Sequence, residues 1–298
     1  MVGYKDFAQY MQEKFPGEKV QKISINAGFS CPNRDGTIGR GGCIYCDNTS
    51  FTPGYCFNNN DIISQLEEGK KFFSRKYPKM KYLAYFQSFS NTFGRSVENL
   101  ERIYREALSV EGVVGLIIGT RPDTLPDEVI AMLAELNCEK PVIVEIGAET
   151  SHDETLQLIN RGHRWSDVEN AVGRLHEKGI AVGLHLIEGL PGENEEMMLR
   201  TIEKAVSLPI ESLKLHHLQI LTDTPIERMW RNGEIEITPF NIETYIDLCI
   251  KIIKLVPQHI AIERFLASSP QGRVVAPKWG MKNYEFVNLL RSRLADIK

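Results

Sequence analysis

Apolar, β-branched runs alternate with helix-like segments along most of this 298-residue chain. A strand that is apolar on both faces has to be covered on both, which is typical of a parallel sheet with helical crossovers. The expected strands are 20–27, 82–89, 113–120, 141–148, 181–189 and 212–221, and the expected helices are 60–76, 97–109, 126–137, helical material up to about 178, 194–207 and 241–256. Six such units predict an α/β fold, a partial (β/α)6 barrel of the TIM type rather than the full eight units.

Both ends of the chain are expected to extend this barrel. Apolar residues recur at helical spacing within residues 1–17, which predicts a helix packed on the body of the fold. The run 259–267 can add a seventh strand. No linker rich in Pro, Ser or Gly interrupts the βα period. We therefore expect a single domain over 1–298, with a core of about 18–258 and a C-terminal extension of about 259–298.

The composition is that of an ordinary globular protein, with 42% hydrophobic and 25% charged residues. The sequence has no run of eighteen apolar residues and no charged-then-apolar leader, so we expect a cytoplasmic protein without a membrane partner. The net charge of −4 argues against a broad polyanion-binding surface, although a small basic face stays possible. The basic and aromatic run 70–82 is interpreted as a solvated face at the far end of the barrel.

Three of the six cysteines lie in one glycine-rich stretch after the first strand, Cys31 to Cys46, with the sequence CPNRDGTIGRGGCIYC. Cys31, Cys43 and Cys46 are separated by eleven and then two residues. A structural zinc takes four protein ligands, whereas an iron–sulfur cube held by three thiolates leaves one iron open to bind and reduce a second molecule. The sequence favours the iron–sulfur cluster, and a zinc loop or unligated thiols remain the alternative.

The other three cysteines are scattered singly along the chain, at Cys56, Cys138 and Cys249. This distribution is not that of a disulfide framework, and we expect the protein to work in a reducing compartment.

In parallel barrels the reactive groups sit where strands end, so the residues after each run carry the functional signal. Gln87 and Ser88 open a polar cluster after the second strand, which either hydrogen-bonds a ligand or caps the next helix. Arg121 and Asp123 follow the third strand and form either a structural clamp or a substrate contact.

The fourth and fifth strands end in further polar residues. Glu149 can accept hydrogen bonds from ribose hydroxyls, and Arg161 offers a two-point partner for a carboxylate. His185 precedes the turn 189–192, where two glycines let a ligand approach the backbone of residues such as Leu190.

The sixth strand carries polar residues on both of its faces. Lys214 and His216 share one face, and His217 and Gln219 share the other. The set that faces the barrel interior is suited to substrate binding or proton transfer.

The cysteine loop, with Tyr45 before its last cysteine and CPNRDGT in its long first gap, resembles that of radical S-adenosylmethionine (SAM) enzymes, in particular the YhcC-like family. This family neighbours the Elongator catalytic subunit, and the resemblance runs from about residue 4 to about residue 280. It implies that Cys31, Cys43 and Cys46 hold a [4Fe–4S] cluster whose free iron chelates SAM. It also implies that flavodoxin or ferredoxin supplies an electron and that a 5′-deoxyadenosyl radical abstracts hydrogen from the substrate.

The resemblance extends to individual strand ends. The stretch GAETSHDETLQLINRGH is similar to one in oxygen-independent coproporphyrinogen oxidase, which implies that Glu149 contacts the SAM ribose and Arg161 its carboxylate. Most relatives have Gln at this position, so Glu149 departs from the family pattern. Residues assigned to SAM binding are Tyr45, Ser88, Glu149, Arg161, His185 and Leu190. Residues assigned to substrate binding or catalysis are Gln87, Lys214 and His216, the last two because the family keeps a K-L-H pattern.

The substrate implied by the resemblance is a nucleobase. A free base of the queuine type, in a lyase or salvage reaction, is our first expectation, because the chain is acidic and carries no appended RNA-binding module. Modification of the wobble base of tRNA is the alternative. A non-enzymatic iron–sulfur or zinc sensor is an alternative of another class. Arg264, Lys278 and Trp279 are weaker candidates for lid or substrate residues.

Overall fold

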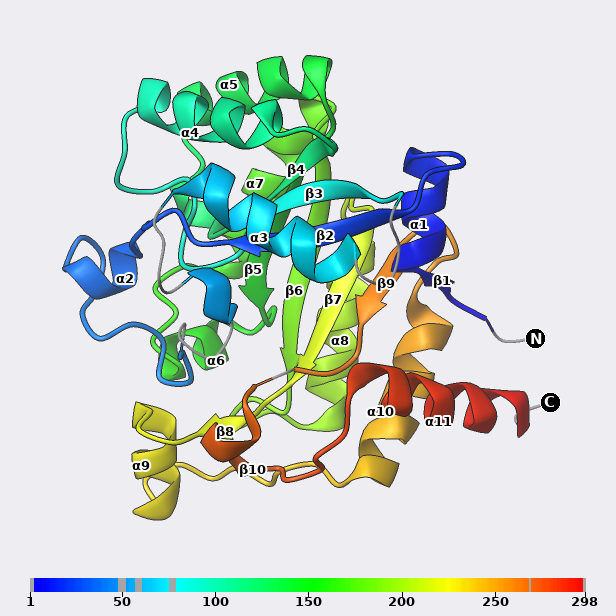
Figure 1. The fold of residues 1–298 in the computed structure, drawn as a ribbon. Coiled ribbons are helices and arrows are strands. Elements are labelled where there is room, and N and C mark those ends of the chain that lie inside the picture. Colours follow the sequence, from blue (N-terminus) through cyan, green and yellow to red (C-terminus); the bar gives the residue numbers. More distant parts are fainter. Residues whose placement is uncertain (1–2, 48–51, 57–60, 75–78, 268, 297–298) are drawn as a thin grey trace.

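The computed structural model describes residues 3–47, 52–56, 61–74, 79–267 and 269–296. Eight parallel strands form one curved sheet in the order β1-β9-β7-β6-β5-β4-β3-β2 (Figure 1). They are β1 (Lys5–Asp6), β2 (Val20–Ile25), β3 (Lys81–Phe86), β4 (Val113–Thr120), β5 (Val142–Glu149), β6 (Ala181–Glu188), β7 (Ser212–His217) and β9 (Ala261–Arg264). The expected partial barrel is confirmed, and β1 and β2 are its two edges.

Helices connect the strands and cover the convex face of the sheet (Figure 1). The longer helices are α1 (Phe7–Lys14), α3 (Ile62–Ser74), α4 (Val97–Ser109), α5 (Asp127–Glu139), α7 (Trp165–Glu177), α8 (Glu195–Val206), α10 (Ile242–Leu255) and α11 (Asn283–Asp296). The shorter ones are α2 (Pro32–Asp35), α6 (Asp153–Leu158) and α9 (Pro225–Arg231). Of the basic run 70–82, residues 75–78 lie outside the described residues. Lys70 and Lys71 pair with Glu67 and Glu68 on α3.

Two features of the fold differ from expectation. The N-terminal segment supplies a strand as well as a helix, because β1 pairs with β9 and thereby extends the sheet. The single strand expected over 212–221 is interrupted after His217. Its last part, β8 (Ile220–Leu221), leaves the sheet and pairs antiparallel with β10 (Val274–Ala276). The C-terminal segment therefore lies against the strand end of β7.

Side-chain alternation along the strands separates an apolar outside from a polar inside. Residues such as Val144, Leu213 and Leu215 point outward into the main core, against the helices. The inward-facing positions near the middle of the sheet are polar or charged instead. They are Lys22, Tyr85, Glu145, His185, Lys214 and Glu263. Burial of these groups requires that they pair with one another.

Helix α1 covers the end of the barrel at which the strands begin. Its residues Phe7, Tyr10 and Met11 pack with inward-facing residues such as Leu83 and Ile143 in a separate apolar cluster. This packing closes one end of the barrel, so that a ligand is expected at the other end, where the strands finish.

The inward-facing cations pair with the carboxylate of Glu145 on β5. Its carboxylate accepts from Lys22 Nζ at 2.6 Å and from Tyr85 Oη at 2.7 Å, lies 2.6 Å from His185 Nε2, and accepts from Lys214 Nζ at 3.3 Å. Burial alone raises the pKa of a carboxyl group, but Lys214 and Lys22 outweigh it and hold the pKa of Glu145 well below its usual range. Five strands are thereby joined through one buried carboxylate.

Replacing Glu145 tests this network. In Glu145→Gln, Lys22 and Lys214 lose a buried counter-charge, and we expect the free energy of unfolding to fall by about 3 kcal/mol or more. Glu139→Gln, which removes an exposed partner of Arg105, is the matched control and is expected to cost about 0.5 kcal/mol or less. Urea unfolding followed by circular dichroism measures both. Equal losses in the two variants would contradict the network.

Among the described residues, no helix is long and apolar enough to cross a membrane.

Candidate active site

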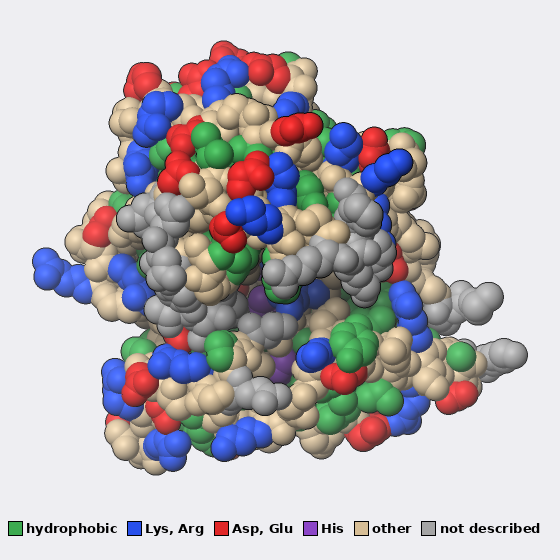
Figure 2. All heavy atoms as spheres, in the orientation of Figure 1, with side chains coloured by type: hydrophobic (Ala, Val, Ile, Leu, Met, Phe, Trp, Pro, Cys, Tyr) green, Lys and Arg blue, Asp and Glu red, His purple; other side chains and the backbone are tan. Residues whose placement is uncertain are grey.

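A cavity opens at the end of the barrel where the strands finish, and Figure 2 shows histidine side chains inside this hollow. Its lining comes from the cysteine loop, from the ends of β3 to β7 and from the segment after β9. Of the residues predicted from sequence, those that line it are Cys31, Cys43, Cys46, Tyr45, Gln87, Glu149, Arg161, His185, Lys214 and His216. Folding thus gathers residues from six separate parts of the chain around one space.

The eleven residues between the first two cysteines fold into a compact turn. Cys31 precedes the short helix α2, which ends at Gly36 in a left-handed conformation (φ 99°). Gly42 is also left-handed (φ 81°), and its N–H donates to the Asn33 carbonyl at 2.8 Å. The side chain of Asn160 donates to the Gly42 carbonyl at 2.8 Å, which ties the turn to the segment after α6. The long gap therefore returns Cys43 to the neighbourhood of Cys31.

The three clustered cysteines differ from the other three in position. Cys31, Cys43 and Cys46 all line the cavity, whereas Cys56 does not, and its thiol lies 3.5 Å from the Ser24 carbonyl. Cys138 and Cys249 lie on the outer helices α5 and α10. Within the described ranges, no three His, Cys, Asp or Glu side chains are already arranged as metal ligands.

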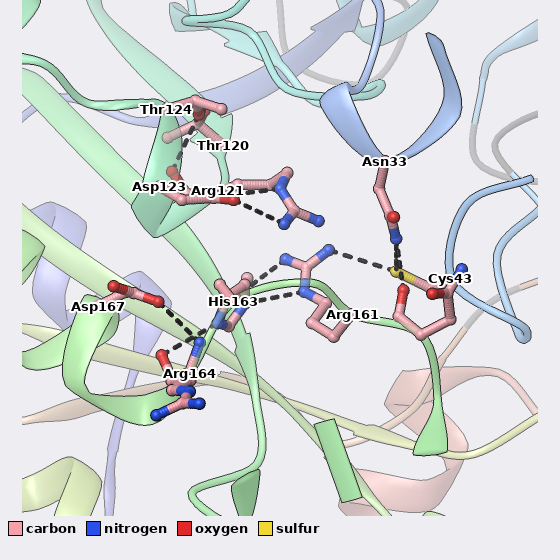
Figure 3. Close-up of polar contacts among 12 residues, drawn as sticks. Asn33, Cys43, Thr120, Arg121, Asp123, Thr124, Arg161, His163, Arg164 and Asp167 are labelled. Carbon is pink, nitrogen blue, oxygen red and sulfur yellow. Dashed lines mark hydrogen bonds and ion pairs between the residues drawn. The ribbon is translucent and has the colours of Figure 1, made fainter. Parts of the chain in front are cut away.

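The surroundings of the cysteines suit an anionic sulfur centre. Asn33 Nδ2 and Arg161 Nη1 approach the Cys43 sulfur at 3.8 and 3.6 Å, and both donate (Figure 3). Burial and the neighbouring Cys43 raise the pKa of the Cys46 thiol to about 11, so this thiol is protonated until a metal displaces the proton. Three thiols with N–H donors directed at one sulfur fit a cluster held by three cysteines.

Most N–H donors of the Arg161 guanidinium group already bind other protein groups. Besides the Cys43 sulfur, its Nη2 donates to the Gly147 carbonyl at 2.6 Å and lies 3.1 Å from Glu149 Oε1, while its Nε donates to His163 Nε2 at 3.0 Å (Figure 3). Burial and the charges of Arg161 and Arg121 lower the pKa of His163 to about 3, so its imidazole is neutral and can accept this bond. The weak sulfur contact is the one that a ligand can most readily replace.

Glu149 sits in a strained position at the end of β5. Its φ of 66° is left-handed, and the pairing of β5 with β6 shifts register between Gly147 and Glu149. A Cβ on Gly147 would lie 2.6 Å from Arg161 Nη2 and 2.8 Å from Glu149 Oε1, so a larger residue there would displace this ion pair. A strained non-glycine residue at a strand end that lines a cavity is typical of a functional position.

Arg121 brings a second buried guanidinium to the same cavity. Its Nε and Nη2 donate to the two carboxylate oxygens of Asp123 at 2.9 and 2.8 Å (Figure 3). Its side chain is only 2% exposed, yet its Nη1 has no hydrogen-bond partner among the described residues. Arg121 therefore forms a structural ion pair with Asp123. Its Nη1 can still donate to a ligand.

The floor of the cavity is formed by the ionic network at the barrel centre. Glu145, His185 and Lys214 line it directly. Lys214 Nζ donates to the Tyr85 hydroxyl at 2.7 Å, and burial lowers its pKa. The rings of His185 and His216 are stacked with centroids 6.0 Å apart. Sequence analysis missed Glu145, although a lone acidic residue inside the apolar run PVIVEIGA was the available signal.

Two predicted SAM contacts do not line this cavity through their side chains. Ser88 is buried, and its hydroxyl lies 3.1 Å from that of Thr52. Leu190 is buried in a second apolar cluster with Ile44 and Ile159, which anchors the cysteine loop. β3 ends at Phe86, so that Gln87 rather than Ser88 faces inward, where it accepts from Ser24 at 3.0 Å.

Family models match both halves of the chain. The model of the Radical SAM superfamily matches residues 31–205, and the Radical_SAM C-terminal domain model matches residues 210–296. The chain belongs to the radical SAM superfamily. The protein is accordingly a radical SAM enzyme, and its cofactors are a [4Fe–4S] cluster and SAM.

Full-length relatives of this radical SAM protein include two bacterial proteins. The uncharacterized protein YtqA of Bacillus subtilis (strain 168) is 34% identical over 293 residues, which are 98% of this chain and 90% of that protein. Protein YhcC of Escherichia coli (strain K12) is 37% identical over 264 residues, which are 88% of this chain and 83% of that protein. The resemblance to YhcC-like proteins is therefore confirmed.

Two further similarities are more distant and cover only part of the other protein. The tRNA uridine(34) acetyltransferase of Dehalococcoides mccartyi is 33% identical over 160 residues, 53% of this chain and 34% of that protein. The structure of the archaeal Methanocaldococcus infernus Elp3 with an N-terminal deletion superposes with a TM-score of 0.72 at 19% identity. That match covers 94% of this chain and 63% of Elp3, and it shows a common fold.

The cysteine positions generate one prediction. Replacing any of Cys31, Cys43 or Cys46 by Ala is expected to abolish incorporation of a [4Fe–4S] cluster, because three thiolates hold it. Cys56→Ala is the matched control and should retain the iron, since Cys56 lies off the cavity. Iron and sulfide analysis after anaerobic reconstitution measures this. Loss of iron in Cys56→Ala would identify a fourth ligand and contradict the open-iron site.

A second prediction concerns Glu188, which lies beside the turn 189–192. Burial and the nearby Glu193 raise its pKa to about 8. Because the unfolded chain ionises this group near its ordinary value of about 4.5, stability should fall as pH rises between about 4.5 and 8. The free energy of unfolding of Glu188→Gln, taken relative to that of wild type, should therefore increase by about 2–4 kcal/mol between pH 5 and pH 8. Urea unfolding at both values, with exposed Glu196→Gln as control, checks this. A gain independent of pH would contradict a buried neutral Glu188.

Proposed function

We propose that this radical SAM enzyme abstracts hydrogen from a nucleobase. When bound, the cluster and SAM supply the 5′-deoxyadenosyl radical that performs the abstraction. A free base of the queuine type, in a lyase or salvage reaction, is the first candidate. The observation that carries the proposal is that the three thiols, two buried arginines and the polar strand ends of β6 and β7 line one cavity. Flavodoxin or ferredoxin is the proposed electron donor.

Residues on the cysteine side of the cavity are proposed to hold the cofactors. Cys31, Cys43 and Cys46 ligate the cluster. Arg161 Nη1 gives up its contact with the Cys43 sulfur and donates to the SAM carboxylate, because its other nitrogens stay bound to protein partners. Tyr45 lies between the last two cysteines and lines the wall beside them.

Other cofactor contacts follow from the same wall. Glu149 Oε2 is the proposed acceptor for ribose hydroxyls, since Oε1 faces Arg161. His185 holds the floor through Glu145 and presents its ring to the ligand. The backbone of the 189–192 turn, rather than the Leu190 side chain, is proposed to approach the cofactor, and Ser88 supports the turn after β3 instead of touching SAM.

Residues on the opposite side are proposed to meet the substrate. Lys214, His216 and Gln87 line the cavity floor and the β7 wall. Lys214 has a lowered pKa within a hydrogen-bonded network, which suits a group that holds or moves a proton. Because the charges of this network are paired, a neutral heterocycle is a better fit to the floor than a free anion.

Modification of the tRNA wobble base is the second candidate. It is favoured by the partial similarity to tRNA uridine(34) acetyltransferases, which covers about half of this chain. A non-enzymatic sensor is the alternative of another class. It is disfavoured by the family and by the polar strand ends, which a sensor does not require.

Two measurements test the proposal. Anaerobically reconstituted protein with SAM and a reductant should release 5′-deoxyadenosine, and a sensor would release none. A comparison of free bases and modified nucleosides in cells with and without the gene then separates the candidates. Accumulation of a free base supports the first, and a changed tRNA nucleoside supports the second.

The proposed role of Arg161 yields a prediction. Arg161→Ala should keep the cluster and weaken SAM binding by about 2–4 kcal/mol, because a charge-assisted contact is lost in a desolvated site. Arg161→Lys should recover only part of this affinity, since an ammonium cannot make the planar contact. Calorimetry on reconstituted variants measures it.

Arg174→Ala, which removes a half-buried arginine paired with Asp127 on the outer helices, is the control. Unchanged SAM affinity in Arg161→Ala, or an equal loss in Arg174→Ala, would remove Arg161 from the cofactor site.

A further inference from the structure

Among the described residues, most of the buried polar atoms without partners belong to residues that line the cavity. In the described part of the chain, eight buried side-chain nitrogen and oxygen atoms have no hydrogen-bond partner, and five of them belong to residues that line this cavity. Arg121 accounts for one and lies towards the cysteine side. The other four are His216 Nε2, His217 Nδ1, Gln219 Oε1 and Ser269 Oγ. Native proteins seldom leave such groups unpaired unless a ligand or water satisfies them.

These four residues come from two segments that the fold places together. His216, His217 and Gln219 follow one another where β7 ends, and Ser269 follows β9. The chain leaves the sheet at this point because β8 pairs with β10. His217, Gln219 and Ser269 also line a second cavity beneath the C-terminal segment, together with Trp279. As neighbours on β7, His216 and His217 point to opposite faces of the sheet, so His216 stacks on His185 inside the barrel and His217 packs against Trp279. His216, Gln219 and Ser269 therefore form a polar wall of the first cavity.

We propose that this wall, formed by His216, Gln219 and Ser269, is the substrate-recognition subsite and takes a flat nitrogen heterocycle that both donates and accepts hydrogen bonds. This inference rests on the proposed function in treating the ligand as a substrate. Gln219 Oε1 can only accept, so the ligand must present a donor there, such as a ring N–H group. The free nitrogen of the His216 imidazole and the Ser269 hydroxyl can each donate or accept.

The remaining surroundings favour a planar ring over a flexible polar chain. The His216 ring is stacked with that of His185 at a centroid distance of 6.0 Å, which gives the cavity a flat aromatic side. Leu218 and Ala267 add apolar lining beside the polar atoms. Burial lowers the pKa of His216, so the wall is uncharged at neutral pH. Apolar faces and a polar edge are the two features of a heteroaromatic base.

Equilibrium dialysis on the reconstituted, SAM-loaded full chain tests the subsite. The probe is 7-deazaguanine, whose six-membered ring carries carbonyl, N–H and amino groups, and which is the ring system of queuine. The control ligand is 7-deazapurine, which has the same rings without these ring substituents. We expect 7-deazaguanine to bind at least about tenfold more tightly, because the control leaves buried acceptors unpaired. Equal binding of the two, or no binding of either, would overturn the subsite.

Variants locate the binding on this wall. Gln219→Leu should lose about tenfold in affinity for 7-deazaguanine, whereas Gln219→Glu, which keeps an acceptor, should stay within about threefold of wild type. Ser269→Ala is a smaller change, and its affinity for 7-deazaguanine should fall about threefold. This variant tests the subsite even if Gln219→Leu fails to fold. Gln12→Leu, on α1 at the far end of the barrel, is the matched control and should change nothing.

SAM affinity and iron content separate this inference from the proposed function. Both should stay within about twofold of wild type in every variant, because none of these variants replaces a residue assigned to the cluster or to SAM. If Gln219→Leu and Ser269→Ala retain wild-type affinity for 7-deazaguanine, the subsite is wrong even though SAM cleavage continues. Release of no 5′-deoxyadenosine by wild type would overturn the proposed function and leave the dialysis result standing.

Discussion

The buried carboxylate of Glu145 is the interaction on which the rest of the structure depends. A half-open barrel of this width has inward-facing positions that apolar side chains from α1 fill only at the closed end. Further along, Glu145 pairs with Lys22, Tyr85, His185 and Lys214. Glu263 supplies the second negative charge for the two lysines, so the hydrogen-bonded floor is neutral as a whole. An isolated charge there would be costly, but a paired set can be polar without being hydrated. The floor fixes the rings and ammonium group that face the cavity.

The second constraint is the docking of the cysteine loop on the segment after β5. Asn33, Asn160 and Arg161 form the contacts, and the backbone of Ile44 pairs with that of Ile159 at 3.1 Å. Arg161 is shared between the loop and the strained end of β5. A long insertion between the first two cysteines is tolerated because α2 and its glycines turn the chain back. The site is thus assembled by side chains that also hold the loop in place.

Much of the fold could be predicted from the sequence, since strands buried on both faces leave uninterrupted apolar, β-branched runs. The break after His217 could not, because KLHHLQIL continues the same pattern and the pairing of β8 with β10 joins residues more than fifty positions apart. Ten candidate site residues were predicted from their positions near the ends of strands, and all ten line the cavity. Ser88 and Leu190 show the limit of that reasoning, because the inward or outward direction of a side chain depends on where a strand stops. Glu145 was visible as a charge in an apolar run, but its four partners come from four other strands.

The central claim is that three cysteines at the barrel mouth hold a [4Fe–4S] cluster with an iron open to SAM. Electron paramagnetic resonance of the anaerobically reconstituted and reduced protein, recorded with and without SAM, tests it most directly. The account predicts the signal of a reduced [4Fe–4S] cluster and a change in its g values when SAM is added, because the amino and carboxylate groups of SAM bind the open iron. A cluster signal that is identical with and without SAM, or a colourless protein that holds zinc, would contradict it.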